Sequence, residues 1–234
     1  REAVTYGWGM GWTWGAFNVR HNHGGGASFS IAHRGVHIDD MELSVSGDHN
    51  ILNALAACAV AHTLGIPFTM IRKTLKEFKG AKRRLQHLGQ INGVEVYDDY
   101  GHHPREIAAT LSAIGRMFPE KRLLVAFQPH RFTRTQALYR DFASVLSTAD
   151  TVFLLPVYQA DEEPIEGVSS ALINTILNEK GYLKSVMCGS LEEAAFELEK
   201  QCLPGDIILT IGAGDISNVG EMFMEKARAE VVHA

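Results

Sequence analysis

The 234-residue sequence lacks the features that mark nucleic-acid-binding, disulfide-rich or zinc-finger proteins. Lys and Arg number 22 against 27 Asp and Glu, a net charge of −5, which excludes a general basic field for nucleic acid or anionic lipid. Cysteine occurs three times, without a Cys-x-x-Cys pair, and no Asn-x-Ser/Thr acceptor site is present. These absences indicate a reducing compartment and exclude a zinc finger.

Long apolar runs and phosphate-loop motifs are missing as well. The most apolar stretch, residues 51–61, is interrupted by Asn53 and is shorter than the ~20 residues that cross a bilayer. No signal peptide is visible, so we expect a cytoplasmic protein without a membrane partner. No Gly-Lys dipeptide occurs, which excludes a P-loop, and no GxGxxG follows a strand, which disfavours a dinucleotide-dependent oxidoreductase. The glycine-rich run at residues 6–14 is predicted to be a structural loop or strand edge.

What remains is an ordinary globular composition, with 46% hydrophobic and 21% charged residues. The first 46 residues predict short β-strands, including residues 27–32 and 36–45, separated by glycines. Apolar spacing predicts a helix over residues 48–64, with Gly47 or Asp48 as its cap, and a second helix with Pro67 near its first turn. The polar, basic segment 78–84 is the best candidate for a linker.

After this linker, apolar strands alternate with amphipathic helices. Strands are predicted at residues 94–97, 123–127, 151–155, 185–188 and 207–211, and helices at 104–118, 135–146, 169–180, 191–201 and from 217 onward. Short strands that are apolar throughout indicate a parallel sheet covered on both faces. The expected fold class is therefore α/β, with a Rossmann-like, doubly wound and mostly parallel sheet at residues 85–234, preceded by an α+β part at residues 1–84.

In such sheets, ligands bind beyond the carboxyl ends of the strands, so four loops are candidates for a site: residues 98–104, 128–135, 156–164 and 212–215. Arg131 and Arg134 are three positions apart, and two guanidinium groups on one side of a turn are predicted to clamp a carboxylate or phosphate. His103 precedes Pro104 and is a plausible helix cap. The acidic segment 161–163 is predicted to be mostly a solvated loop.

A second polar cluster lies at the start of the first predicted helix. His49, Asn50 and Asn53 share one face of its first turn, although the rest of that helix is apolar. Asn offers a donor and an acceptor together, which matches an adenine edge. Helix capping would explain one of these residues rather than all three.

Four segments, in this order, resemble motifs of the Mur ligase family: Gly47-Asp-His-Asn-Ile-Leu-Asn-Ala-Leu-Ala-Ala57, Gly80-Ala-Lys-Arg-Arg84, Asp98-Asp-Tyr-Gly-His-His-Pro104 and Gln128-Pro-His-Arg-Phe-Thr-Arg134. The resemblance extends from about Tyr6 to Glu225. It implies that residues 1–84 are the C-terminal part of a central ATP-binding domain and residues 85–234 the whole Rossmann-like third domain. The family's UDP-sugar domain, P-loop and central magnesium ligands are absent, so we expect this chain to be catalytically incomplete.

The resemblance also implies an activity: ATP-dependent ligation of L-alanine to the carboxylate of UDP-N-acetylmuramate, through an acyl phosphate, in peptidoglycan synthesis, which serves cell shape and division. Tyr100-Gly101 and the segment 128–134 favour this branch over the murein tripeptide ligases of cell-wall recycling. Two alternatives remain: a murein tripeptide ligase of cell-wall recycling, and a non-catalytic nucleotide-binding module.

The motifs further imply roles for individual residues. His49, Asn50 and Asn53 resemble residues that contact adenine, and Arg84 (or less favourably Arg83) and Asp99 resemble those that contact the phosphates and ribose of ATP. The residues that resemble those facing the muramoyl carboxylate and L-alanine are Tyr100, His102, His130, Arg131 and Arg134. Mg²⁺ is implied as a cofactor whose ligands lie mostly outside this chain. The expected partners are the small substrates and the remaining segments of the same enzyme, and not nucleic acid.

Overall fold

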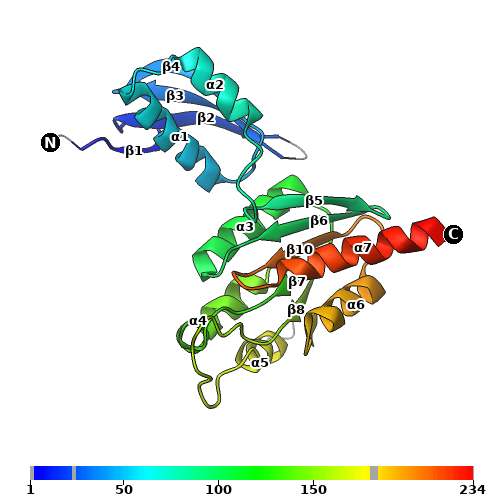
Figure 1. Ribbon diagram of the computed structural model, residues 1–234. Coiled ribbons are helices and arrows are strands. Elements are labelled where there is room, and N and C mark those ends of the chain that lie inside the picture. The colour runs from blue at the N-terminus through cyan, green and yellow to red at the C-terminus, as the bar shows by residue number, and fades with distance from the viewer. Residues whose placement is uncertain (1–2, 23–24, 180–183, 234) are drawn as a thin grey trace. The chain divides into compact units, whose positions relative to one another are not determined.

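The computed structural model (Figure 1) describes residues 3–22, 25–179 and 184–233. The chain divides into two compact units. One comprises residues 1–80 with 112–119, and the other comprises residues 81–111 with 120–234. The first break along the chain therefore lies within the basic segment that the sequence suggests as a linker.

The first unit contains a four-stranded sheet in the order β1-β2-β3-β4. The strands are β1 (Tyr6–Trp8), β2 (Trp14–His21), β3 (Ala27–His33) and β4 (Val36–Leu43). β1 runs parallel to β2, and the other neighbours are antiparallel. The glycine-rich run 6–14 thus forms a short strand and the turn before β2, as predicted.

Helices α1 (Asp48–Thr63) and α2 (Phe68–Glu77) pack on this sheet. Alternate strand residues meet one side of α1 in a common core that includes Trp14, Phe29, Ile31, Met41, Ile51, Leu55 and Cys58. Both helices occur where the apolar spacing predicts them. Gly47 occupies the N-cap of α1 without a side-chain hydrogen bond, so Asp48 does not cap the helix.

The second unit contains a six-stranded sheet in the order β5-β6-β10-β7-β8-β9. Its strands are β5 (Gln86–Ile91), β6 (Val94–Asp99), β7 (Leu123–Phe127), β8 (Thr151–Leu154), β9 (Lys184–Met187) and β10 (Ile207–Ile211). All neighbours are parallel except β5 and β6, which form an antiparallel hairpin. The mostly parallel sheet confirms the predicted fold class, whereas β5 was not predicted.

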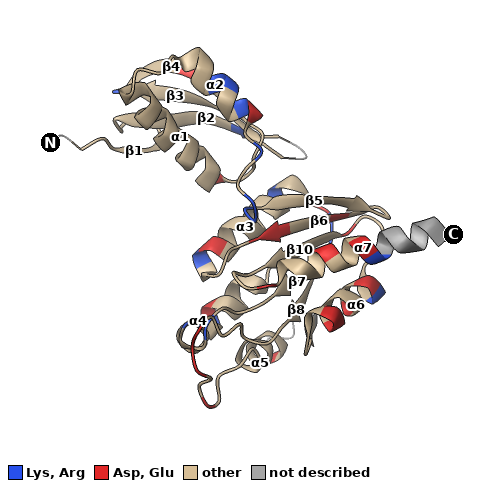
Figure 2. Cartoon of the chain, viewed as in Figure 1, with Lys and Arg blue, Asp and Glu red and all other residues tan. Residues whose placement is uncertain are grey.

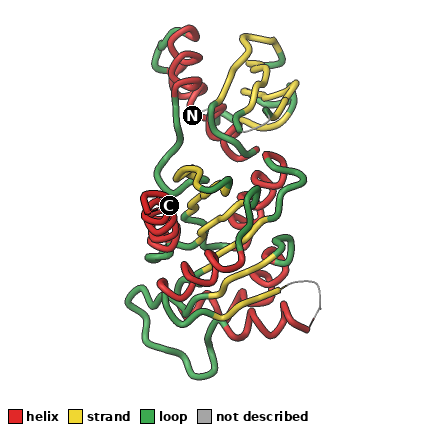
Figure 3. Tube along the Cα trace, turned by 90° about the vertical axis from the view of Figure 1, so that its right-hand side faces the viewer, coloured by secondary structure: helices red, strands yellow, loops and turns green. Residues whose placement is uncertain are grey.

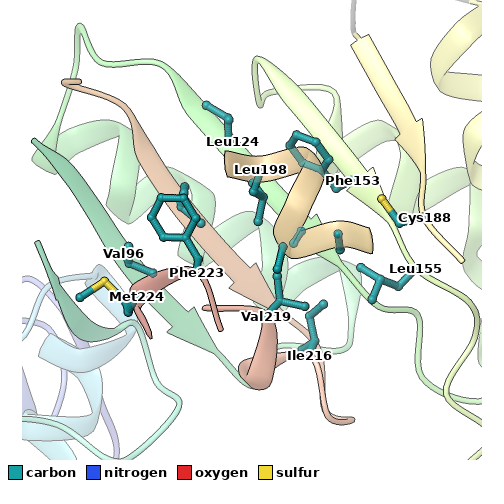
Figure 4. Packing of buried hydrophobic residues seen from close by; sticks show 14 of the residues in the cluster. Val96, Leu124, Phe153, Leu155, Cys188, Leu198, Ile216, Val219, Phe223 and Met224 are labelled. Atoms are coloured by element: carbon teal, nitrogen blue, oxygen red, sulfur yellow. The ribbon is translucent and has the colours of Figure 1, made fainter. Parts of the chain in front are cut away.

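Helices cover both faces of this sheet, as the edge-on view in Figure 3 shows. They are α3 (Pro104–Met117), α4 (Phe132–Leu146), α5 (Ala171–Glu179), α6 (Leu191–Gln201) and α7 (Ser217–His233). α6 and α7 pack on one face through Leu198, Val219 and Phe223 (Figure 4). α4 packs on the other, where Phe142 contacts Phe127 at 5.2 Å between ring centroids. The strand ends that precede α3, α4 and α7 consequently lie at one edge of the sheet.

The cysteines belong to the packed interior or its margin. Cys58 and Cys188 are buried, and burial raises the pKa of both thiols to about 12. Cys202 is half-buried, and burial raises its pKa as well.

Within the described residues, the chain contains no helix with the length and apolar character needed to span a membrane.

Candidate functional site

The adjacent residues Asp98 and Asp99, which end β6, are buried, and the ribbon of β6 is red there in Figure 2. Asp98 is 1% exposed. Its Oδ1 accepts a hydrogen bond from Thr210 Oγ1 at 2.6 Å, and its Oδ2 accepts one from Arg83 Nε at 2.9 Å. Both oxygens are therefore occupied by protein donors, and Asp98 joins β6 to β10 and to the segment before β5.

Asp99 orders the loop that follows β6. Its Oδ1 accepts from the Gly101 amide and its Oδ2 from the Leu85 amide, both at 2.7 Å. Burial raises the pKa of Asp99, while these two amides and the Arg84 guanidinium act in the opposite direction. In the structure, the Asp99 carboxylate is held by backbone amides and lies close to Arg84. The contact of Asp99 with nucleotide stays a prediction.

The two neighbouring arginines are placed differently. Arg83 donates to Asp98 and to the carbonyls of Gly212 and Gly214. The Arg84 side chain is exposed, and its charge favours the ionised forms of the nearby Asp99 and Glu106. Of the two candidates that the sequence leaves open, Arg84 is the one whose guanidinium is available to a ligand.

Tyr100 and His102 follow on the same loop. The Tyr100 ring is 38% exposed and meets the His102 ring edge-on, with 5.6 Å between centroids. His102 Nδ1 lies 3.2 Å from the carbonyl oxygen of Tyr100. A carbonyl only accepts hydrogen bonds, so Nδ1 carries a proton and donates it to this oxygen.

His103 caps α3, as the sequence predicts. Its Nδ1 accepts a hydrogen bond from the Arg105 amide at 3.3 Å. Glu106 Oε2 in turn accepts from the amides of His102 and His103, at 3.0 and 3.3 Å. This reciprocal arrangement is a capping box with histidine at the N-cap, and it fixes the end of the loop that holds Tyr100 and His102.

His130, in the loop after β7, is held between Tyr158 and Arg134. Its ring stacks on Tyr158 with 5.5 Å between centroids and an interplanar angle of 11°. Burial lowers the pKa of His130, and Arg134, His102 and Arg131 lower it further. Arg134 Nη1 lies 3.3 Å from His130 Nδ1. A guanidinium only donates, so Nδ1 accepts and the neutral ring carries its proton on Nε2.

These contacts bring the first two predicted loops together. The rings of His102 and His130 lie 5.9 Å apart between centroids, so Tyr100, His102, His130 and Arg134 form one connected group. Arg131 is close enough to His130 to lower its pKa. Tyr158 completes the group and was not among the predicted site residues. Its place in the loop after β8 was the signal that could have identified it.

The loop that contains Tyr158 also supports α4. Glu162 accepts from the Thr133 amide at 3.0 Å and from Thr133 Oγ1 at 2.6 Å. The segment 161–163 is mostly a solvated loop, as predicted, and within it the partly exposed Glu162 anchors the first turn of α4. This contact and the Arg131 amide bond to Tyr158 O (2.8 Å) explain why α4 begins at Phe132, three residues earlier than predicted.

The fourth loop, after β10, lies against the second and third. Gln128 Nε2 donates to Asp215 Oδ1 at 2.7 Å. A Cβ atom on Gly214 would overlap Gln128 Oε1 and lie 2.6 Å from the Tyr158 ring, so only glycine fits there. A cavity of about 630 Å³, lined in part by Gln128, Tyr158 and Asp215, opens beside this contact. All four predicted loops thus meet at one edge of the sheet.

The predicted adenine-contacting residues lie in the first unit, on the first turn of α1. Asn53 Nδ2 donates to Asn50 Oδ1 at 3.5 Å, and Asn50 Nδ2 donates to Ser46 O at 2.8 Å. A Cβ atom on Gly47 would lie 2.6 Å from Cε1 of the His49 ring. Gly47 also has φ 102°, in the left-handed region. The turn therefore requires glycine at position 47. The contact of His49, Asn50 and Asn53 with adenine stays a prediction.

Residues 83–214 match the family described as "Mur ligase, glutamate ligase domain". This segment contains β5 through β10 and the loops that form the site. The chain belongs to the Mur ligase family.

Two curated relatives are UDP-N-acetylmuramate–L-alanine ligases. The one from Desulforapulum autotrophicum is 43% identical over 198 residues, which are 84% of this chain and 43% of the relative. The one from Agathobacter rectalis is 41% identical over 226 residues, which are 97% of this chain and 49% of the relative. This chain therefore spans less than half the length of these relatives.

Solved structures of ligases also match this chain. The UDP-N-acetylmuramate-alanine ligase of Thermotoga maritima matches with a TM-score of 0.80 and 28% identity, over 97% of this chain and 48% of that one. A murein peptide ligase of Psychrobacter arcticus matches with a TM-score of 0.63 and 22% identity, over 92% of this chain and 44% of that one. The latter likeness shows a shared fold.

Proposed function

We propose that this chain is the C-terminal half of an ATP-dependent ligase that joins L-alanine to the carboxylate of UDP-N-acetylmuramate in peptidoglycan synthesis. The observation that supports this best is the group formed by Tyr100, His102, His130 and Arg134 at the carboxyl edge of the sheet. Its guanidinium and N–H donors suit a reaction whose substrate, acyl phosphate and tetrahedral intermediate are all anionic. The enzyme would act in the cytoplasm.

We assign residues 1–84 to the end of a central ATP-binding domain and residues 85–234 to the C-terminal domain. ATP is the nucleotide of the proposed reaction. His49, Asn50 and Asn53 would contact its adenine, and Arg84 and Asp99 its ribose and phosphates. The exposed Arg84 guanidinium supports this assignment. Mg²⁺ would accompany the nucleotide, with its protein ligands mostly in the part of the enzyme outside this chain.

The proposed reaction begins when the muramoyl carboxylate attacks the γ-phosphorus of ATP, which forms an acyl phosphate and releases ADP. Arg131 and Arg134 would hold the carboxylates of the two substrates, since a guanidinium matches the geometry of a carboxylate. His130 remains neutral because burial and the neighbouring guanidinium groups lower its pKa. It therefore presents Nε2–H as a donor to the anionic oxygen that forms later.

The alanine amine must lose a proton to attack the acyl carbon. His102 would take this proton at Nε2 when its ring is neutral, because Nδ1 already donates to the Tyr100 carbonyl. Amine attack gives a tetrahedral oxyanion, and its collapse expels phosphate and leaves the amide. Two histidines with ring centroids 5.9 Å apart would thus play opposite parts, one as donor and the other as proton acceptor.

A chimera tests this proposal. This chain would replace the aligned half of the Agathobacter rectalis ligase, which it matches over 226 residues. We expect the purified chimera to form ADP only when UDP-N-acetylmuramate and L-alanine are both present, with product confirmed by mass spectrometry. A parallel assay offers a murein tripeptide in place of L-alanine.

The outcomes separate the candidates. Activity with L-alanine supports the proposed ligase, whereas preference for the tripeptide supports the cell-wall recycling alternative. A chimera that unfolds cooperatively and binds ATP but makes no product would favour a non-catalytic nucleotide-binding module.

A further inference from the structure

Arg83 connects two loops of the candidate site, the one after β6 and the one after β10. Its Nε donates to Asp98 at 2.9 Å, Nη1 donates to Gly214 O at 2.9 Å, and Nη2 donates to Gly212 O at 2.6 Å. Its own carbonyl accepts from the Tyr100 amide at 2.6 Å. Every guanidinium nitrogen is thus engaged by the protein, which sets Arg83 apart from an arginine that awaits a ligand.

Both imidazoles of the site rest on residues that Arg83 holds. The guanidinium lies over the Tyr100 ring, 5.1 Å from its centroid, and Tyr100 contacts His102. On the other side, Gly214 packs tightly against Tyr158, and Tyr158 stacks on His130. A shift of Arg83 would therefore reach His102 through one neighbour and His130 through two.

The backbone around Arg83 is also unusual. Arg83 has φ 56° and Leu85 has φ 47°, and the left-handed region is unfavourable for both residue types. Such conformations persist where surrounding contacts fix them. Here the fixing contacts are the three side-chain bonds of Arg83 and the Asp99 carboxylate on the Leu85 amide. The turn directs Arg83 inward and leaves Arg84 exposed.

We infer that Arg83 is a positioning residue. It holds Tyr100 and the Gly212–Gly214 carbonyls so that His102 and His130 face one substrate, while Arg84 meets the nucleotide. The kinetic part of this inference rests on the proposed ligase function.

The matched pair Arg83→Lys and Arg84→Lys in the chimera tests it. Lysine keeps a positive charge beside Asp98 but cannot reach three separate acceptors as the planar guanidinium does. We expect Arg83→Lys to lower kcat/KM for L-alanine by on the order of 10²-fold, because a displaced catalytic group costs about that much. The KM for ATP should stay unchanged. Arg84→Lys should raise the KM for ATP instead.

An Arg83→Lys chimera with unchanged alanine kinetics, or with ATP kinetics altered as in Arg84→Lys, would overturn the inference. A second measurement does not depend on ligase activity. In the 234-residue chain, Arg83→Lys should shift the imidazole NMR signals of His102 and His130 and leave those of His33 and His62, in the first unit, in place. Unchanged His102 and His130 signals would contradict the inference even if the chimera proves inactive.

Discussion

The contact between Arg134 and His130 depends on the planar geometry of the guanidinium as well as on its charge. Arg134 Nη1 contacts both Nδ1 and the carbonyl of His130, each at 3.3 Å. Arg134→Lys keeps the charge and loses the planar fork, so transition-state stabilisation should weaken while substrate binding changes less. We expect kcat of the chimera to fall by about 10²–10³-fold, as when a preorganised donor is removed.

Steady-state kinetics with all three substrates varied would check this prediction, alongside a melting curve. Arg140→Lys is a matched control, because Arg140 lies on the same helix and contacts Tyr139 instead of the site. Near-native kcat combined with a lowered Tm in Arg134→Lys would show that the arginine only stabilises the loop.

The lowered pKa of His130 gives stability a pH dependence. Its pKa in the folded chain lies below the ordinary value of 6.5, chiefly because of burial and Arg134. As the pH falls below about 6.5, the unfolded chain therefore takes up a proton before the folded chain does, and the free energy of unfolding decreases. Below the pKa of His130 in the folded chain, the free energy of unfolding stops decreasing. At alkaline pH, where His130 is neutral in both states, it adds no pH dependence to the free energy of unfolding.

His130→Asn should make this acid-induced loss of stability shallower. Urea unfolding of both proteins between about pH 7.5 and 5 would measure the slope. His33→Asn provides a comparison in the first unit, because burial and His62 also lower the pKa of His33. Equal slopes in wild type and His130→Asn would contradict the prediction.

At the residue scale, the sequence predicts which residues lie at the site but does not predict the contacts that they make. It places Tyr100, His102, His130, Arg131 and Arg134 on loops after strands, and the structure brings them to one edge. It does not distinguish Arg83 from Arg84, since adjacent arginines have the same chemistry. That difference depends on φ 56° at Arg83 and on acceptors 129 and 131 positions away in the chain.

Among the elements, α3 shows how a cap supports the site. The His103 ring and Glu106 satisfy amides at its start. His103→Ala should lower the free energy of unfolding by about 1 kcal/mol, as N-cap removal usually does. His103→Asn should retain most of it, because Asn is a good N-cap residue. Urea unfolding of the two variants checks the prediction, and equal stabilities would contradict it.

The elements also show where apolar patterning stops being informative. β7 is apolar throughout and β10 is apolar except for Thr210, and the bounds of both agree with prediction because both strands are buried between helices. β5 contains Gln86, Gly89 and Gln90 and lies at the sheet edge, where one side needs no partner. The signal that could have revealed it is Asn92-Gly93, a two-residue hairpin turn with φ 50° and 79°.

For the whole molecule, the sequence lacks a P-loop, so the purified 234-residue chain should not catalyse ATP-dependent ligation. Phosphate release in the presence of ATP, UDP-N-acetylmuramate and L-alanine measures this directly. The active chimera is the positive control. Release by the chain alone that depends on both other substrates would contradict the prediction.

The buried thiols have a practical consequence for spectroscopy. Cys58 and Cys188 are shielded from solvent, and their pKa values of about 12 leave almost no thiolate at neutral pH. A single cysteine introduced on an exposed position such as Lys200 should therefore react with a maleimide dye in the folded chain well before Cys58 and Cys188. Fluorophores could then be attached site-specifically without first removing these two buried thiols, and mass spectrometry before and after denaturation would count the labels.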